Sequence, residues 1–424
     1  MLDIKYIRDN TELVKKKLTS RKEDAGVIDL LLSDYKLKLE ILNETEKLQS
    51  ERNKTSDKIA VMMRNKENTD DIKSGMKVIS DKVKTLEEEL KSIDLKISSA
   101  LRDIPSLPDD SVPFGKDASE NVEIKVKGDK KSFSFKPKDH LELSKKLNIL
   151  DFERGAKITG SGFALYMGKG ATLERSLINF MLDTHIENGY TEVMTPVLVN
   201  RASMEAAEKV PKFEEDMYHM EKDDLFAIPT SEVPIINIHR NEILKEESLP
   251  IKYSGFSSCF RREAGSYGKD TKGFLRVHQF NKVELINFSK PEDSYSEMEK
   301  MLNDACRILD ALKIHYRIIE LCTGDLSFSA SKCYDIEVWS YAEDKWLEAS
   351  SVSNCTDFQS RRGEIRYKKK LENGKFRNEF VHLLNGSGLA TSRLMVSLLE
   401  SNQDENGNII VPEVLRKYTG WSLI

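Results

Sequence analysis

Between residues 72 and 97 the chain repeats an apolar residue at alternating separations of four and three positions. The members of this unbroken series are Ile72, Met76, Ile79, Val83, Leu86, Leu90, Ile93 and Ile97. Apolar residues at this spacing form one stripe along an α-helix, and a partner helix must cover that stripe. The series therefore predicts a long helix that belongs to a coiled coil.

The preceding residues, 28–66, supply a candidate for the partner helix. They contain neither glycine nor proline, and only the short polar segment 65–71 separates them from the heptad series. Two long helices with so short a connection must fold back on each other. We expect an antiparallel coiled-coil hairpin at least about 45 Å long, at ~1.5 Å of rise per residue.

The outer half of the first helix is rich in positive charge. Residues 47–66 carry six basic side chains against Glu51 and Asp57, and hydroxyl and amide side chains lie between them. Such a run is typical of a solvated coiled-coil face, but it also suits a sugar–phosphate backbone. Because a projecting polar arm has no packing purpose, we favour RNA binding, with Arg52, Lys54 and Lys58 as the contacts.

Length and charge set the outline of the rest of the chain. A chain of 424 residues is expected to form two domains. Because the net charge is −5, a nucleic acid could bind only at local basic patches. Pro105 and Pro108 end the second helix and begin a linker. We therefore predict an N-terminal domain over residues 1–110 and a second domain over residues 111–424.

The cysteines and the apolar content indicate the cellular compartment. Five cysteines lack paired spacing, which favours reduced thiols; zinc ligation by Cys322, Cys333 and Cys355 is the alternative, although no C-x-x-C pair is present. The N-terminus is charged, and no run approaches the ~20 apolar residues of a membrane span. We expect a cytoplasmic protein without a membrane partner.

Residues 251–287 are interpreted as two strands joined by a polar, glycine-containing loop. Arg261 and Glu263 share one face of the first strand, and the second strand starts near Leu275 with Phe280 among charged neighbours on its polar face. A guanidinium suits phosphate oxygens and a flat ring suits stacking on a base. A solvated hairpin is the alternative, but a strand face exposed to solvent does not explain an aromatic residue, Phe280, among the charged ones.

Three further segments combine polar residues with turn or helix signals. Thr230 and Glu232 precede a short helical stretch, as helix caps do. Glu348 and Ser351 are either part of a serine-rich turn or oxygen donors for a magnesium ion held mainly by phosphates. A glycine-rich turn precedes an apolar helix that carries Arg393, an arrangement that favours anions.

The order of these segments resembles the class II aminoacyl-tRNA synthetases. FRREAG at 260–265 with Arg276 resembles motif 2, and the strand and helix over 380–400 resemble motif 3. The helix–strand unit over 171–199, interrupted by Pro196, resembles motif 1, although it also fits an ordinary α–β connection. The helical hairpin followed by IPSLPDD narrows the resemblance to bacterial-type seryl-tRNA synthetases, over essentially the whole chain.

The resemblance implies a fold and a reaction. The expected fold is α+β, with an antiparallel-sheet class II catalytic core and an N-terminal antiparallel helical hairpin. The implied enzyme is a ligase that activates L-serine with ATP to seryl-adenylate and transfers the seryl group to the 3′ end of tRNA(Ser). The alternatives are a ligase for another amino acid, or a non-catalytic homologue that acts as an RNA-binding or coiled-coil interaction protein.

The resemblance also implies roles for individual residues. Catalysis falls to Arg261, Arg393 and Glu348. ATP binding falls to Arg261, Arg262, Glu263, Val277, Phe280, Glu348, Ala349, Ser350, Ser351 and Arg393. L-serine is expected to be bound by Thr230, Ser231, Glu232, Glu284 and Ser387. Glu348 and Ser351 are expected to bind magnesium. The arm is expected to bind tRNA, and the motif 1 segment is expected to form a homodimer interface.

Overall fold

The computed structural model describes residues 1–263 and 273–424 and divides the chain into two units, Met1–Pro105 and Ser106–Ile424. Most of the loop expected between the two motif 2 strands lies outside the described residues. In the described ranges, no helix is both long enough and apolar enough to cross a membrane.

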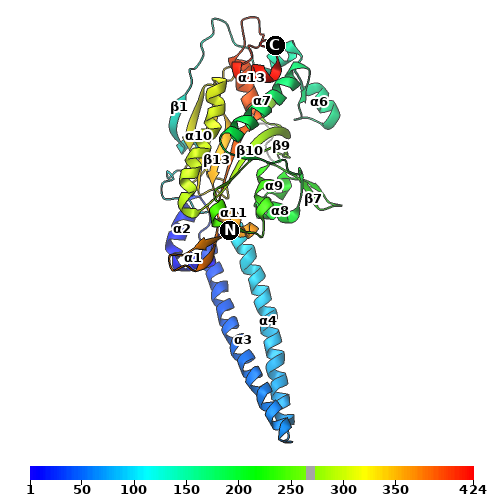
Figure 1. The fold of residues 1–424 in the computed structure, drawn as a ribbon, viewed down its shortest axis with the longest axis vertical. Helices are drawn as coiled ribbons and strands as arrows, with labels where there is room; N and C mark the ends of the chain where they lie inside the picture. The colour runs from blue at the N-terminus through cyan, green and yellow to red at the C-terminus, as the bar shows by residue number, and fades with distance from the viewer. Residues whose placement is uncertain (264–272) are drawn as a thin grey trace. The chain divides into compact units, whose positions relative to one another are not determined.

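The first unit is helical. Its elements are α1 (Ile4–Asp9), α2 (Thr11–Ser20), α3 (Val27–Arg64) and α4 (Asp70–Asp103). Helices α3 and α4 run side by side and antiparallel (Figure 1). The seam residues Val83, Leu86, Ile93 and Ile97 are buried along α4. The predicted coiled-coil hairpin is therefore confirmed.

Ion pairs between α3 and α4 fix which residues of the hairpin lie opposite each other. They join Lys38 to Asp94 at 2.6 Å, Asp34 to Lys96 at 2.8 Å and Glu44 to Lys82 at 2.5 Å. Exposed pairs of this kind contribute at most about 1 kcal/mol each, so they select the register more than they stabilise it. The apolar seam provides the stability.

The second unit is built on a mixed sheet of eight strands in its described part. In sheet order the strands are β1 (Val122–Lys127), β11 (Tyr316–Glu320), β12 (Lys332–Ser340), β13 (Lys345–Asn354), β16 (His382–Ala390), β10 (Gln279–Ser289), β9 (Ile251–Phe260) and β4 (Thr191–Glu192). All neighbours pair antiparallel except β9 and β4. This arrangement confirms the predicted α+β fold with an antiparallel core.

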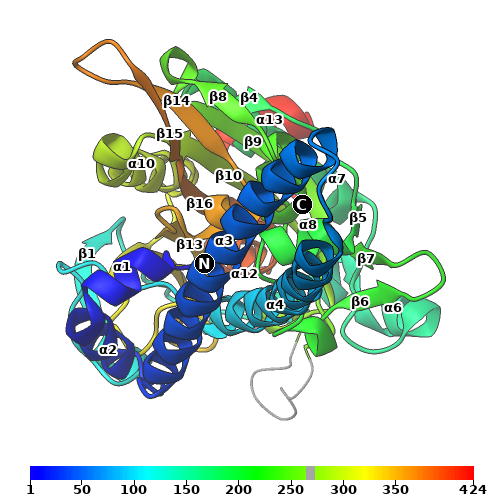
Figure 2. The same ribbon diagram turned by 90° about the horizontal axis from the view of Figure 1, so that it is seen from below.

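Smaller sheets flank the main one. They consist of β2 (Leu150–Asp151) with β3 (Leu165–Tyr166), of β5 (Leu198–Asn200), β7 (Leu225–Ala227) and β6 (Tyr218–Met220), and of β15 (Phe376–Phe380), β14 (Arg366–Lys370) and β8 (Ile243–Lys245). Figure 2 shows β8, β14 and β15 together as one group. The remaining short helices include α5 (His140–Leu147), α6 (Phe152–Thr159) and α11 (Phe358–Gly363).

Strand β10 separates two apolar cores by simple alternation. Val283 and Leu285 lie in the larger core, with α7 (Lys169–Glu187), α10 (Ser294–Leu312), α12 (Thr391–Ser401) and α13 (Glu413–Thr419). Ile286 and Phe288 lie in the second core, beside α8 (Arg201–Ala206) and α9 (Glu232–Ile236). The even-numbered side chains therefore project away from the main helices, and Glu284 is one of them.

Two predicted strands have different limits in the structure. The first motif 2 strand ends at Phe260 instead of 262, and the second begins at Gln279 instead of 275. Gly273–Leu275 forms a 3₁₀ turn, η5, and this turn includes Leu275, which alternation had assigned to the start of the strand. The stretch 191–199 is also split, because β4 joins the main sheet while β5 pairs with β7.

Candidate active site

Two adjoining cavities lie on the even-numbered side of β10. Their volumes are about 730 Å³ and about 250 Å³. Six residues line both: Arg261, Glu263, Arg276, Lys282, Glu348 and Ser387. Because these shared residues are mostly charged, the two cavities form one polar site with two compartments.

The smaller cavity brings together most residues that the motif resemblance assigned to ATP. In addition to the shared residues, it is lined by Val277, Phe280, Ala349, Ser350 and Arg393. The Arg261 guanidinium lies 5.1 Å from the centre of the Phe280 ring, a cation–π distance. A backbone bond from Arg261 N to the His278 carbonyl at 2.9 Å holds this arginine beyond the end of β9.

Glu263 and Arg262 follow β9, and only Glu263 lines the cavities. Glu263 has a φ of +50° and pairs with Arg276 at 3.2 Å, so its carboxylate stays at the cavities. Arg262 lines neither cavity, and its backbone N–H donates to the Asp216 carbonyl at 2.9 Å. The structure therefore places Arg262 apart from the other residues assigned to ATP.

Arg393 connects three segments of the site. It is the third residue of α12, and its guanidinium donates to the Glu348 carbonyl at 2.9 Å and to the Glu348 carboxylate at 3.3 Å. Its Nε also donates to the Leu275 carbonyl at 3.4 Å. A side chain with three such contacts has a defined position before any ligand arrives.

A β-bulge brings Glu348 and Ser351 to the same cavity. Residues three apart on a regular strand point to opposite faces, but the register of β12 and β13 shifts at Ala349, so both side chains line the larger cavity. These residues lie within β13, so the serine-rich turn considered from sequence is absent from this described segment. The Glu348 side chain is half exposed, which leaves its carboxylate accessible.

Glu284 is a buried residue that lines the larger cavity. It is opposite Ser387 on β16 and opposite Gly255 on β9. Its carboxylate accepts a hydrogen bond from the Thr230 hydroxyl at 3.4 Å and pairs with Lys282 at 2.5 Å. Burial raises the pKa of Glu284, and Lys282 offsets part of that rise.

Glu232 is buried in a different electrostatic setting. Lys209 lies 3.1 Å from its carboxylate, Gln359 donates to it at 2.5 Å and Asn385 donates at 3.2 Å. Burial alone would raise the pKa of Glu232, but Lys209 and Gln359 together hold the pKa below its usual value. The pKa values of Glu284 and Glu232, two of the carboxyl groups that line the larger cavity, are thus shifted in opposite directions.

Ser231 is separated from its neighbours in the TSE segment. Its hydroxyl lies 2.5 Å from the Ser257 hydroxyl, and it lines neither cavity. Thr230 and Glu232 on either side do line the larger cavity. The structure therefore does not bring Ser231 to the cavities with the other residues assigned to serine.

The glycines near Ser387 are part of a strand, which corrects the predicted turn. Strand β16 continues through them to Ala390. A Cβ on Gly388 would lie 2.4 Å from Nε2 of His185, and the Gly388 carbonyl lies 2.6 Å from the same nitrogen. The glycine is thus required for close packing against α7.

Comparisons with known proteins agree with this geometry. Residues 1–108 match the model of the seryl-tRNA synthetase N-terminal domain, and residues 212–402 match the model of the tRNA synthetase class II core domain (G, H, P, S and T). A serine–tRNA ligase of Chloroherpeton thalassium is 53% identical over 430 residues, covering 100% of both chains. The chain belongs to the seryl-tRNA synthetase family.

Further members of the seryl-tRNA synthetase family support the assignment. A serine–tRNA ligase of Listeria welshimeri is 48% identical over 99% of this chain and 98% of its own. The crystal structure of the Pyrococcus horikoshii enzyme complexed with ATP has a TM-score of 0.94 at 39% identity, covering 100% of this chain and 99% of that chain. The recognition made from sequence motifs is therefore confirmed.

The residues of the larger cavity that sequence reasoning missed include three that contact its buried carboxylates or lie beside them: Lys209, Lys282 and Asn385. Lys282 was recognisable, because it lies between Phe280 and Glu284 on the same strand face. Asn385 precedes Ser387 by two residues on β16, so alternation also pointed to it. Lys209 lies after α8 in a segment without a pattern, and only the tertiary structure brings it to Glu232.

The arm residues assigned to tRNA lie on α3, within the first unit. Lys54 and Lys58 are exposed, and Arg52 is half-buried. The two lysines are one helical turn apart and so lie on the same side of α3. The described cysteines are all free and buried, and no group of three or more His, Cys, Asp or Glu residues suited to a metal occurs in the described ranges.

Proposed function

We propose that this chain activates L-serine with ATP and transfers the seryl group to the 3′ end of tRNA(Ser), with magnesium as the cofactor. The observation that carries the proposal is the pair of joined cavities. One is lined by Phe280, Arg393 and Glu263, and the other by Glu284 and Thr230. Arg261 lines both, at the place where the two substrates would meet.

The first step joins the two compartments. The serine carboxylate attacks the α-phosphorus of ATP, and pyrophosphate leaves as seryl-adenylate forms. Arg261 would stabilise the charge that develops at the α-phosphate, and Arg393 would hold the terminal phosphates. In the second step a terminal ribose hydroxyl of tRNA attacks the acyl carbon of seryl-adenylate, the acyl–phosphate bond breaks and AMP leaves. Both steps run on positioning and charge stabilisation.

Glu348 and Ser351 are the proposed magnesium residues. Both line the larger cavity, and Glu348 offers a half-exposed carboxylate. Two protein oxygens leave most of the coordination sphere to water and phosphate oxygens, which is how magnesium is usually held beside nucleotides. When bound, the ion would neutralise charge on the phosphate oxygens of ATP.

Selection of serine is assigned to Glu284 and Thr230, with Ser387 beside them and Glu232 as a partner for the substrate ammonium. A site built to hydrogen-bond a hydroxyl rejects the analogue without it by roughly 10⁴–10⁵, because its own polar groups would be left unpaired. Alanine should therefore be a very poor substrate. Threonine keeps the hydroxyl, and exclusion of its extra methyl is worth only ~1–3 kcal/mol.

The test is amino-acid-dependent exchange of pyrophosphate into ATP, measured with each amino acid in turn. Serine should give the highest rate of exchange. The rate with alanine should be lower by roughly 10⁴–10⁵. Stronger stimulation by a different amino acid would make the chain a class II ligase of other specificity. Absence of exchange with every amino acid would support the non-catalytic RNA-binding alternative.

Binding of tRNA by the arm should depend on salt. Replacing Arg52, Lys54 and Lys58 with alanine should weaken tRNA binding and reduce the slope of log affinity against log salt by about 2 to 3, since each phosphate contact releases close to one counterion. The measurement is a filter-binding titration at several salt concentrations.

A charge-matched variant controls for net charge in the same titration. Lys77, Lys84 and Lys91 are exposed at seven-residue spacing along α4, and replacing them with alanine removes the same number of charges. This variant should keep the wild-type slope. An equal loss of slope in both variants would show that the proposed face of α3 is only solvated.

We further propose a cytoplasmic homodimer that forms through the motif 1 segment. Met194 is 90% exposed, and Val197 and Leu198 beside it are exposed as well. Clustered apolar side chains of this kind mark association surfaces. The five buried free thiols fit a reducing compartment.

Light scattering on a Met194→Asp variant tests the interface. The variant should dissociate at concentrations where the wild type is dimeric.

A further inference from the structure

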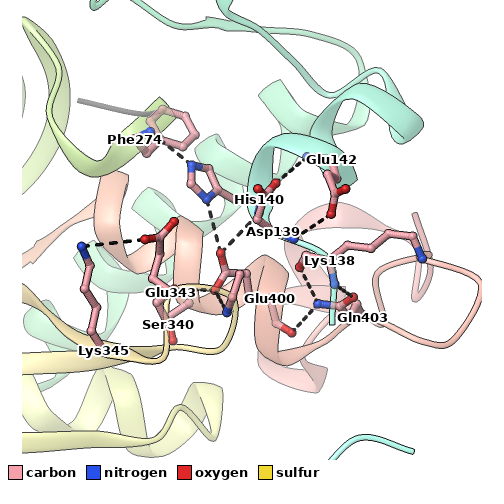
Figure 3. Close-up of polar contacts among 12 residues, drawn as sticks. Lys138, Asp139, His140, Glu142, Phe274, Ser340, Glu343, Lys345, Glu400 and Gln403 are labelled. Atoms are coloured by element: carbon pink, nitrogen blue, oxygen red, sulfur yellow. Dashed lines mark hydrogen bonds and ion pairs between the residues drawn. The ribbon is translucent and has the colours of Figure 1, made fainter. Parts of the chain in front are cut away.

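A buried histidine outside both cavities contacts the segment that walls the smaller one. His140 is the first residue of α5 and is 2% exposed. Its ring faces η5, where Phe274 and Leu275 line the smaller cavity. Figure 3 shows the His140 ring between Phe274 and Glu400, with a contact to each.

The two ring nitrogens of His140 have different partners. Nε2 accepts a hydrogen bond from the backbone N–H of Phe274 at 3.4 Å, and Nδ1 lies 3.3 Å from Oε1 of Glu400. A backbone N–H only donates, so Nε2 must be unprotonated. The hydrogen is then on Nδ1 and points to the carboxylate. Glu400 therefore selects the tautomer that lets His140 hold Phe274.

Glu400 is itself held firmly. It is completely buried near the end of α12, and its Oε2 accepts from the Ser340 hydroxyl at 2.7 Å and from Ala342 N at 3.2 Å. Its Oε1 also accepts from His140 N at 3.3 Å. A carboxylate with this many donors is fixed in place. The orientation of the His140 ring is thus set by β12, α5 and α12 together.

Gly273 shows how closely the ring approaches η5. The residue has a φ of +58°, and a Cβ there would lie 2.3 Å from Nε2 of His140. On the other side of the turn, the Leu275 carbonyl accepts from Arg393. Helix α12 therefore holds η5 at two points, directly through Arg393 and through His140 by way of Glu400.

We propose that His140, oriented by Glu400, is a positioning residue for the nucleotide compartment. By holding the Phe274 N–H it keeps η5 against α12, so that Leu275 reaches Arg393 and Arg276 reaches Glu263. The inference rests on the proposed function, because the compartment is taken to bind ATP. A purely structural histidine would stabilise the fold without a selective effect on ATP.

Two conservative variants separate these roles. The His140→Gln amide can place its oxygen near the position of Nε2 and still accept from Phe274. The His140→Asn amide reaches only the Nδ1 position, so it keeps the Glu400 contact and leaves the Phe274 N–H without a partner. Each variant loses one buried hydrogen bond, so similar losses of thermal stability are expected.

Their kinetics should differ in pyrophosphate exchange. We expect His140→Asn to raise the KM for ATP by about tenfold, the scale of one unsatisfied buried donor, with a much smaller change in the KM for serine. His140→Gln should restore most of the affinity for ATP. Gly273→Ala places a Cβ against the His140 ring and should displace it from η5, so this variant should raise the KM for ATP as well. It provides the test if His140→Asn does not fold.

A control comes from His382 on β16, a half-buried histidine that lies 2.9 Å from the Ser294 hydroxyl and lines neither cavity. His382→Asn should lower stability and leave the KM for ATP unchanged. Equal KM values for ATP in His140→Asn and His140→Gln, or an equal rise in His382→Asn, would overturn the positioning role. Absence of serine-dependent exchange in the wild type would instead contradict the proposed function.

Discussion

Replacing Glu284 with alanine should abolish serine-dependent pyrophosphate exchange while the protein still binds ATP. The substitution removes the carboxylate that Thr230 and Lys282 contact, and it leaves Lys282 buried without its partner. Breaking a buried ion pair on one side costs about 3–5 kcal/mol, which corresponds to a loss of at least a hundredfold if it falls on serine binding. Phe280 and Arg393 lie in the other compartment and are unaffected.

The measurement combines exchange assays with serine, alanine and threonine and equilibrium binding of ATP to the same variants. Glu284→Gln is the matched control, because it keeps the size of the side chain and a hydrogen-bonding oxygen while removing the charge. It should retain more activity with serine than Glu284→Ala. Normal activation of serine by Glu284→Ala, or equal use of alanine and serine by the wild type, would show that Glu284 does not select the amino acid.

Shortening the helical arm should separate the two half-reactions. The ion pairs of α3 with α4 indicate that residues whose numbers add to about 130 lie opposite each other. Replacing residues 48–84 with a short glycine-rich turn would therefore remove Arg52, Lys54 and Lys58 while Lys38 and Asp94 remain paired. Serine-dependent exchange should remain close to that of wild type, but aminoacylation of tRNA should fall by about a hundredfold or more, as phosphate contacts are lost.

Circular dichroism and light scattering would show that the shortened chain is folded and has the wild-type assembly state. In protein that passes both controls, parallel loss of exchange and aminoacylation would contradict the division of labour between arm and core. Retained aminoacylation would show that the outer arm is not needed for tRNA.

The sequence predicted those parts of the molecule in which a repeat determines the contacts. The heptad series required a partner helix, and α3 and α4 provide that hairpin. Alternation along β10 placed Phe280 and Glu284 on one face, and both line the site. In each case the contact follows from the local period of the backbone.

Features that depend on tertiary structure were not accessible in this way. The shared cavity of Glu348 and Ser351 requires a bulge at Ala349, and no pattern in the sequence marks a bulge. The late start of β10 follows from η5, which is held by His140 more than 130 residues earlier in the chain. Lys209 reaches Glu232 only because the second core brings α8 and α9 together.

The heptad seam between α3 and α4 also determines the steps in which the arm can change its length. Adding or removing seven residues in each helix would preserve the apolar stripe and the sites of the interhelical ion pairs. It would change the length of the hairpin by about 10 Å per step, at 1.5 Å per residue. An increment that is not a whole number of heptads would rotate the stripe relative to the partner helix and locally change the supercoil. The length of the arm can therefore change in whole heptads without any change in the sequence of the catalytic unit.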